Sequence, residues 1–324
     1  MDGGAPKSEK MPYVWRAHTS LRGHTYYTWE PLVPRIHDGY LQCVVFLYSA
    51  EEDAWHGVHR GASGFLVGVP TEKYGDRALH IYAVTNSHAV RDEREATRFL
   101  RLNKTNGESD VIETPFDAWI HHPEGEEIAV LPIGLSEYHE YKVARPEKFV
   151  TQEIIERYEI GPGDEVFMVG RFIHHEGRKR NLPSIRFGNI SMMPVERITR
   201  QGADSAEGFL VEMRSMAGYS GSPVFLLPGT VSYGRKELLS EILLLGVDWG
   251  HIKDRAKVLR HERDEWQETG DVVEFNTAMS AVVPAWRLQE MFDLKELKDA
   301  RREAETDLYL PPIEEPIQND SANG

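Results

Sequence analysis

Short apolar runs separated by turn residues constrain the fold of this 324-residue chain more than any other feature of its sequence. Each run is too short for a long helix, and Gly, Pro, Asn and Asp lie between the runs. Repeated short runs with such punctuation are typical of strands in a β-barrel or sandwich. The chain is therefore predicted to be all-β. The first six expected strands are Leu41–Tyr48, Gly64–Val69, Ala78–Thr85, Thr97–Leu102, Phe116–Ile120 and Glu127–Ile133. The second six are Glu165–Phe172, Ser184–Met192, Gly208–Met213, Ser222–Leu227, Ile242–Trp249 and Thr277–Val283.

Three stretches break the strand pattern. Thr151 can cap a short helix that Gly161-Pro162-Gly163 closes. Pro284 suits the first turn of a helix, and the residues after it alternate apolar and polar at helical spacing up to about residue 306. The charged insertion 251–276 is expected to form a surface helix and loop. A C-terminal α-helix is thus predicted to follow the last strand.

Composition limits the classes of partner and compartment. The formal net charge of −15 argues against a general nucleic-acid binder, which would show a basic face. Cys43 is the one cysteine, so no disulfide can form within the chain, and we expect a reducing compartment with Cys43 in the core. No stretch reads as a signal peptide or a membrane span. A cytoplasmic protein with no membrane partner is the resulting expectation.

A polar turn between two apolar runs is the first candidate for chemistry. It reads Gly218-Tyr219-Ser220-Gly221-Ser222-Pro223, between Phe209–Val211 and Val224–Leu227. Glycines on both sides of Ser220 allow backbone angles that other residues adopt only at a cost. Such a turn can present one hydroxyl and aim neighbouring N–H groups at a common point, as a serine nucleophile beside an oxyanion hole requires. A Gly-, Ser- and Pro-rich β-turn without chemistry is the alternative.

Two further residues can complete a catalytic triad. His88 follows the apolar run 83–85 at a strand-to-turn junction, and Glu127 opens a buried-strand pattern. The order along the chain is therefore His88, Glu127, Ser220, which matches one of the known triad orders.

These segments together resemble the trypsin/chymotrypsin-fold serine peptidases. The resemblance is closest to their bacterial HtrA-like and glutamyl-endopeptidase-like branches, and it covers roughly residues 40–292. The acid is glutamate here, whereas the family motif has aspartate. The matching segments are Thr85-Asn-Ser-His88-Ala-Val, Glu127-Ile-Ala-Val-Leu131, Gly218-Tyr-Ser220-Gly-Ser-Pro223 and Gly246-Val-Asp-Trp-Gly250.

The resemblance implies two six-stranded antiparallel β-barrels followed by a C-terminal helix, without a PDZ domain. Its expected divisions are an irregular N-terminal arm (1–39), a first barrel (40–140), an inter-barrel linker (141–162), a second barrel (163–283), the helix (284–306) and a disordered tail (307–324).

The resemblance also implies a role for each site residue. Ser220 would be the nucleophile, His88 its general base, and Glu127 the acid that orients the imidazole. The amides of Gly218 and Ser220 would form the oxyanion hole. Neighbouring carboxylates could replace Glu127; they are Glu126, Glu124 and Asp117.

Substrate preference is not predicted. The resemblance assigns the cleft wall to Asp248, Trp249 and Gly250 and to residues 214–217, which begin with Arg214. Asp248 would favour a basic substrate side chain, and Arg214 could neutralise it. The opposite charges of Asp248 and Arg214 therefore leave the preferred substrate side chain undetermined.

No metal or organic cofactor is expected. Neighbouring histidines in a strand point to opposite faces, so His121-His122 and His174-His175 are expected to be surface residues. No phosphate-binding loop or dinucleotide fingerprint is present. The sequence thus predicts a serine endopeptidase, a hydrolase of protein or peptide substrates. The alternatives are a peptidase-fold binding module with little turnover, and a protease that a regulatory protein partner activates.

Overall fold

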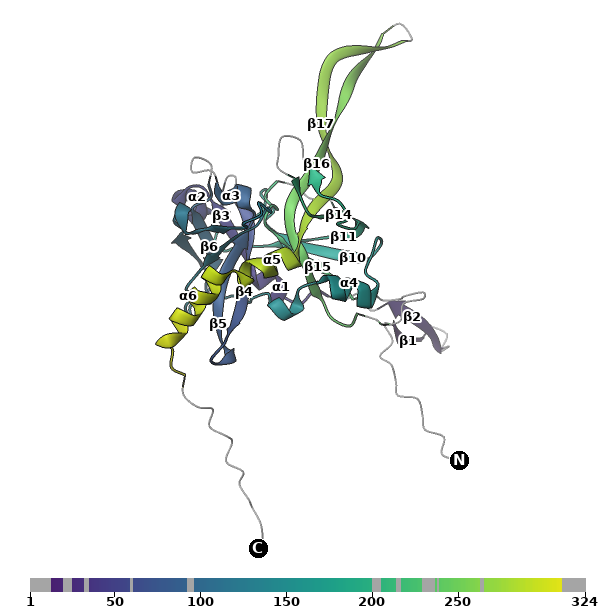
Figure 1. The fold of residues 1–324 in the computed structure, drawn as a ribbon. Coiled ribbons are helices and arrows are strands. Elements are labelled where there is room, and N and C mark those ends of the chain that lie inside the picture. Colours follow the sequence, from purple (N-terminus) through teal and green to yellow (C-terminus); the bar gives the residue numbers. More distant parts are fainter. Residues whose placement is uncertain are drawn as a thin grey trace.

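Two systems of antiparallel strands, joined by a linker and followed by two helices, form the structure, a computed structural model (Figure 1). It describes residues 13–19, 25–31, 35–58, 61–91, 96–199, 205–213, 217–228, 237, 239–262 and 265–310. The predicted all-β, chymotrypsin-like class with a C-terminal helical segment is confirmed.

The first strand system has seven strands in the order β7-β6-β3-β4-β5-β9-β8, so it has one strand more than predicted. The added strand, β7, is polar and half-exposed, which hid it in the sequence. The expected strand over Phe116–Ile120 is a 3-10 turn, η1 (Phe116–Ala118), that leads into the short β8. The strands are β3 (Val44–Tyr48), β4 (Gly61–Thr71), β5 (Gly75–Thr85), β6 (Phe99–Asn103), β7 (Ser109–Glu113), β8 (Ile120–His121) and β9 (Ala129–Pro132).

The second strand system is a closed six-stranded barrel in the order β10-β11-β14-β17-β16-β15, as predicted. Its inward residues alternate with outward ones, so Val166, Met168, Ile190 and Val211 are all buried. A small ribbon, β12 (Ile198–Thr199) with β13 (Ser205–Ala206), accompanies it. The barrel strands are β10 (Glu165–Gly170), β11 (Ser184–Met192), β14 (Phe209–Glu212), β15 (Pro223–Leu226), β16 (Leu243–Glu262) and β17 (Glu265–Pro284).

The prediction of a helix and loop for residues 251–276 is wrong. Those residues extend β16 and β17 into a long hairpin that projects from the barrel (Figure 1). Charges oppose each other across it: Lys253 lies 2.6 Å from Glu274, and Lys257 lies 2.8 Å from Glu268. These pairs stabilise a two-stranded ladder, and they explain a charge density that resembled that of a surface helix.

The N-terminal arm also contains strands. β1 (Tyr13–Thr19) and β2 (Thr25–Pro31) pair in antiparallel register, where an irregular segment was expected. Aromatic and β-branched residues dominate both segments, and such residues favour strands. The rest of the arm up to residue 34 and the tail from residue 311 lie outside the described residues.

Short helices lie between the strands, in the linker and after the last strand. Thr151 caps α4 as predicted, because its hydroxyl accepts from the Ile154 amide at 3.3 Å. The expected single C-terminal helix is two helices, because Leu294 has an extended ψ of 137°. The helical segments are α1 (Gly39–Gln42), α2 (Glu51–His56), α3 (Ser87–Arg91), η2 (Pro146–Lys148), α4 (Gln152–Tyr158), α5 (Ala285–Asp293) and α6 (Lys295–Thr306).

One apolar core spans the seam between the two strand systems. It joins Val84 and Val130 of the first with Phe167 and Val247 of the second. Cys43 lies in this core, as predicted, and burial raises the pKa of its thiol to about 12. No helix among the described residues has the length and apolar character needed to cross a membrane. The shared core fixes the strand ends at the seam relative to each other.

Candidate active site

His88 lies just beyond the end of β5, in the first turn of α3. Its ring is partly exposed, with 45% of the side chain open to solvent. The turn before it is fixed by Asn86, which is fully buried and donates from Nδ2 to the Glu127 carbonyl at 2.9 Å. The backbone of the His88 turn is therefore fastened to the segment that carries the predicted acid.

The Glu127 carboxylate contacts His88 twice. Its Oε2 lies 3.0 Å from His88 Nδ1 and accepts the His88 amide N–H at 3.1 Å. Burial alone would raise the pKa of this carboxyl, but the hydrogen bonds from His88 and the nearby charges of His88 and Arg91 hold the pKa below its usual value. An ionised carboxylate in this place accepts the Nδ1 proton, which leaves Nε2 as the basic nitrogen.

The other candidate carboxylates point elsewhere. Glu126 is fully buried and pairs with Arg197 at 2.6 Å. Glu124 pairs with Arg287, and Asp117 is exposed. Glu127 is thus the one carboxylate, of the four considered, that the structure brings to His88. The extra methylene of glutamate relative to aspartate does not prevent this contact.

The Ser220 turn depends on its two flanking glycines. Gly218 and Gly221 have φ values of +98° and +86°, which side chains with a Cβ rarely adopt. A β-carbon at Gly221 would collide with the Ser63 carbonyl and the Thr85 hydroxyl, and one at Gly218 would collide with Ile173. The glycines therefore allow the turn to pack directly against the first strand system.

Ser63 on β4 ties this turn to the segment that carries His88. Its amide donates to the Ser220 carbonyl at 2.9 Å, and its hydroxyl donates to the Gly218 carbonyl at 2.7 Å. The hydroxyl also accepts the Arg171 amide, and the Ser63 carbonyl accepts the hydroxyl of Thr85, the last residue of β5. Ser63 was not predicted as a site residue from the sequence, where it stands in the segment Gly61-Ala-Ser-Gly64.

Tyr219 anchors the turn from its other side. The ring is completely buried, and its hydroxyl contacts the Ser184 hydroxyl and accepts from Arg186 Nε at 3.1 Å. The side chain between Gly218 and Ser220 therefore points into the second barrel, while Ser220 itself keeps partial exposure.

Two amides of the Ser220 turn were predicted to form the oxyanion hole. Within the described part of the chain, the N–H groups of Gly218 and Ser220, the predicted oxyanion-hole donors, have no hydrogen-bond acceptor. Over the same residues, no hydrogen bond joins the His88 ring to the Ser220 hydroxyl. The acid–histidine contact is thus formed, and the histidine–serine contact is not formed in this arrangement.

The predicted substrate-binding residues are mostly interior. Asp248 is fully buried, and its carboxylate accepts from the Ser280 hydroxyl. Its backbone pairs with the Ser220 turn, through Gly221 N–H to Asp248 O at 2.8 Å. Trp249 and Gly250 are also buried, and Arg214 lies outside the described residues. The Asp248 side chain thus lies inside the barrel, bonded to Ser280, and its role in substrate binding stays a prediction.

No described residues form a metal site of three or more His, Cys, Asp or Glu side chains. His121 contacts the Ser87 hydroxyl at 2.7 Å, and burial with the nearby Arg91 charge lowers its pKa. His122 is buried beside Glu290, so its expected surface position is wrong. His174 and His175 are exposed, as expected.

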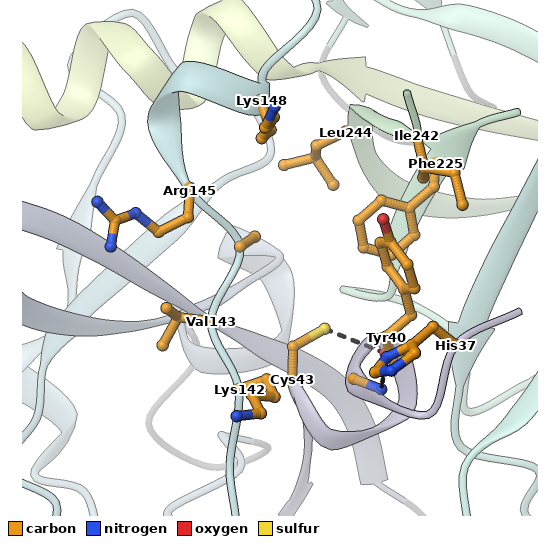
Figure 2. A pocket seen from close by; sticks show the side chains of 12 residues that line it. His37, Tyr40, Cys43, Lys142, Val143, Arg145, Lys148, Phe225, Ile242 and Leu244 are labelled. Atoms are coloured by element: carbon orange, nitrogen blue, oxygen red, sulfur yellow. Dashed lines mark hydrogen bonds between the residues drawn. The ribbon is translucent and has the colours of Figure 1, made fainter. Parts of the chain in front are cut away.

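A separate cavity of about 380 Å³ lies between the linker and the second barrel (Figure 2). Tyr40, Phe225 and Leu244 form an apolar wall, and Lys142 and Lys148 lie at its edge. None of the predicted site residues lines this cavity. The candidate catalytic residues therefore belong to a different part of the seam.

Comparison with known proteins gives likeness in structure alone. No protein-family model matches the sequence, and no curated protein matches it. Among solved structures, Deg5 is similar at 15% identity over 78% of this chain and 88% of that one, with a TM-score of 0.44. The Rv3671c protease of M. tuberculosis H37Rv in an inactive form is similar at 12% identity, over 78% and 89%, with a TM-score of 0.40.

The HtrA-type protease AlgW, solved with a decapeptide, is similar at 12% identity over 79% of this chain and 65% of that one, with a TM-score of 0.38. Because these scores are low, the strand order of the chain itself is the basis for assigning the fold.

Proposed function

We propose that this protein is a serine endopeptidase that cleaves protein or peptide substrates through Ser220, His88 and Glu127. One observation carries the proposal: a buried carboxylate oxygen accepts both the ring and the backbone N–H of His88. This geometry fixes one tautomer and stabilises the imidazolium that forms when His88 takes a proton.

The chemistry follows the usual order for such a triad. His88 Nε2 removes the proton from Ser220, and the Ser220 oxygen attacks the peptide carbonyl. The Gly218 and Ser220 amides stabilise the negative oxygen of the tetrahedral intermediate. His88 then protonates the leaving amine, and water hydrolyses the acyl-enzyme. Hydrogen bonds between base and nucleophile are often long before substrate binds, so the open His88–Ser220 contact is compatible with this mechanism.

The test is covalent labelling by a fluorophosphonate probe. Wild-type protein should label at Ser220, located by peptide mass analysis, and Ser220→Ala should not label. Ser222→Ala is the matched control, because Ser222 lies in the same turn but its hydroxyl is buried. This control should label at the wild-type rate. Equal labelling of wild type and Ser220→Ala would remove Ser220 as the nucleophile.

A binding module without turnover is the second candidate function. The open His88–Ser220 contact and the buried Asp248 favour it. In that case wild-type protein would leave the probe unreacted and would still bind an unfolded protein such as casein. A protease that a regulatory partner activates would label only after the partner is added. Cytoplasmic location stays a prediction of the sequence.

A further inference from the structure

The hairpin of β16 and β17 continues far beyond the barrel. Its cross-strand pairs run from Lys253↔Asn276 to Glu262↔Glu265. At about 3.4 Å per residue, this outer part is roughly 30 Å long. It projects into solvent with no other strand or helix packed on it among the parts that the structure describes (Figure 1). A two-stranded ribbon of this kind is only marginally stable by itself in water.

One face of the outer hairpin, which we call the apolar face, carries Ala256, Val273 and Phe275 together with one carboxylate, Asp254. The pairs Ala256↔Val273 and Asp254↔Phe275 share this face, because directly opposed residues point the same way. Val273 is 50% exposed and Phe275 is 44% exposed. The other face carries the charged pairs of Lys253 and Lys257, together with Val272. The apolar face is therefore open to a binding partner.

One edge of the hairpin leads directly to the candidate nucleophile. β15 pairs with β16 only as far as Val247, and Asp248 then exchanges backbone hydrogen bonds with Gly221 and Ser222. Beyond that point β17 is the single strand neighbour of β16 among the described residues. The side of β16 that meets the Ser220 turn thus continues outward as a strand edge along residues 252–259.

We propose that this edge binds an extended segment of the substrate polypeptide by strand addition, and that the apolar face beside it receives the substrate's apolar side chains. The inference rests on the proposed function and specifies its substrate class: unfolded chain segments in which apolar residues alternate with polar ones. Backbone hydrogen bonds between the edge and the substrate provide affinity that depends little on the substrate sequence. The alternating side chains of the substrate provide the preference for apolar residues at every second position. A chain bound there would extend past Ser220.

A substrate polypeptide fits this edge better than a second copy of the protein. Pairing two copies through the same edge would place the cations Lys253, Arg255 and Lys257 of β16 against their equivalents, which is unfavourable. The exposed apolar face is also a short two-stranded surface, smaller than stable dimers usually bury.

The first experiment removes the outer hairpin. Residues 253–276 are replaced by Asn-Gly, which joins Ile252 to Thr277; these ends are adjacent, because the Thr277 hydroxyl donates to the Ile252 carbonyl at 2.8 Å. We expect kcat/KM for casein to fall at least tenfold and kcat/KM for a short peptide ester to change less than twofold. Equal losses on both substrates, or no loss on casein, would contradict the proposal.

The second experiment needs no turnover, so it separates this inference from the proposed function. Ser220→Ala protein is titrated into a fluorescent peptide of alternating valine and threonine, and anisotropy reports binding. Val273→Lys should weaken binding about tenfold, whereas Val272→Lys, one residue away on the other face, should not. Equal effects of the two variants would overturn the proposal. So would light scattering that shows a dimer lost on hairpin removal with peptide binding unchanged.

Discussion

The two halves of the candidate site are built by different means. The His88 half depends on a side chain, because Glu127 contacts both the ring and the amide of His88. The Ser220 half depends on backbone, because two left-handed glycines let the turn lie against Ser63 and Thr85. The first half should therefore be sensitive to charge and the second to volume. Substitutions in each half can test this difference.

Glu127→Gln should have the largest effect. An amide in this place presents N–H to His88 Nδ1, which favours the wrong tautomer, so kcat should fall by about three to four orders of magnitude. Glu126→Gln is the control, since it removes the same charge one residue away, from a carboxylate that pairs with Arg197 and accepts the Glu207 amide but does not contact His88. Fluorophosphonate labelling rates measure both. A Glu127→Gln protein as active as Glu126→Gln would show that the carboxylate contact is not catalytic.

Gly221→Ala should have the next largest effect, by displacing the turn. A β-carbon there meets the Ser63 carbonyl and the Thr85 hydroxyl, so the Ser220 backbone must move. We expect labelling to slow by about a hundred- to a thousand-fold, as when an oxyanion donor is lost. Gly107→Ala is the matched control for Gly221→Ala, because Gly107 has the same φ of +86° but open space around it. The Gly107→Ala protein should label at the wild-type rate. Its loss of stability in thermal unfolding measures the cost of alanine at a positive φ without a steric collision.

Ser63→Ala tests the backbone half by a smaller change, since it keeps the backbone bond to Ser220 and removes only the hydroxyl. The buried Gly218 carbonyl and Arg171 amide would each lose a partner, at about 1–3 kcal/mol per group. We expect kcat to fall roughly ten- to a hundred-fold with KM nearly unchanged, because the loosened group is the oxyanion turn. Ser109→Ala, another buried serine of the first strand system, controls for a general loss of stability. A rise in KM alone would argue against this positioning role.

The sequence could predict the parts of this molecule that depend on local pattern. The closed barrel follows from short apolar runs with turn residues between them, and the turn around Ser220 follows from its glycines. Ser63 could not be assigned, because its importance comes from three partners far away in the chain. Asp248 could not be oriented, because its inward direction depends on strand register.

The hairpin of β16 and β17 shows a different limit of prediction from sequence. Lys253, Arg255 and Lys257 alternate with other residues at period two, a strand pattern, but the high charge density favoured a surface helix in our interpretation. Cross-strand pairing with Glu268 and Glu274 settles the conformation, and such pairing cannot be read from one strand alone. Local charge is thus a weaker guide than periodicity.

Glu305→Gln should have the smallest effect, on stability without activity. This buried carboxylate of α6 accepts from the Glu72 and Lys73 amides at 3.0 and 2.9 Å and contacts His80 at 2.8 Å. Burial raises the pKa of the Glu305 carboxyl, but the bonds from His80 and these amides bring it below the usual 4.5. Removing the charge should cost about 1–2 kcal/mol in urea unfolding at pH 7, with labelling unchanged.

The pH dependence gives the sign of this contribution. Because the folded pKa of Glu305 is depressed, its stabilisation is complete above the unfolded pKa of about 4.5 and is lost as the pH falls through the lower folded value. The stability difference between wild type and Glu305→Gln should therefore shrink in acid. Glu303→Gln, an exposed change on the same helix, should show no such difference at pH 7. If Glu305→Gln slowed labelling of Ser220, the contact of α6 with β5 would influence the candidate active site. The site would then depend on side-chain contacts outside the seam as well as on its His88 and Ser220 halves.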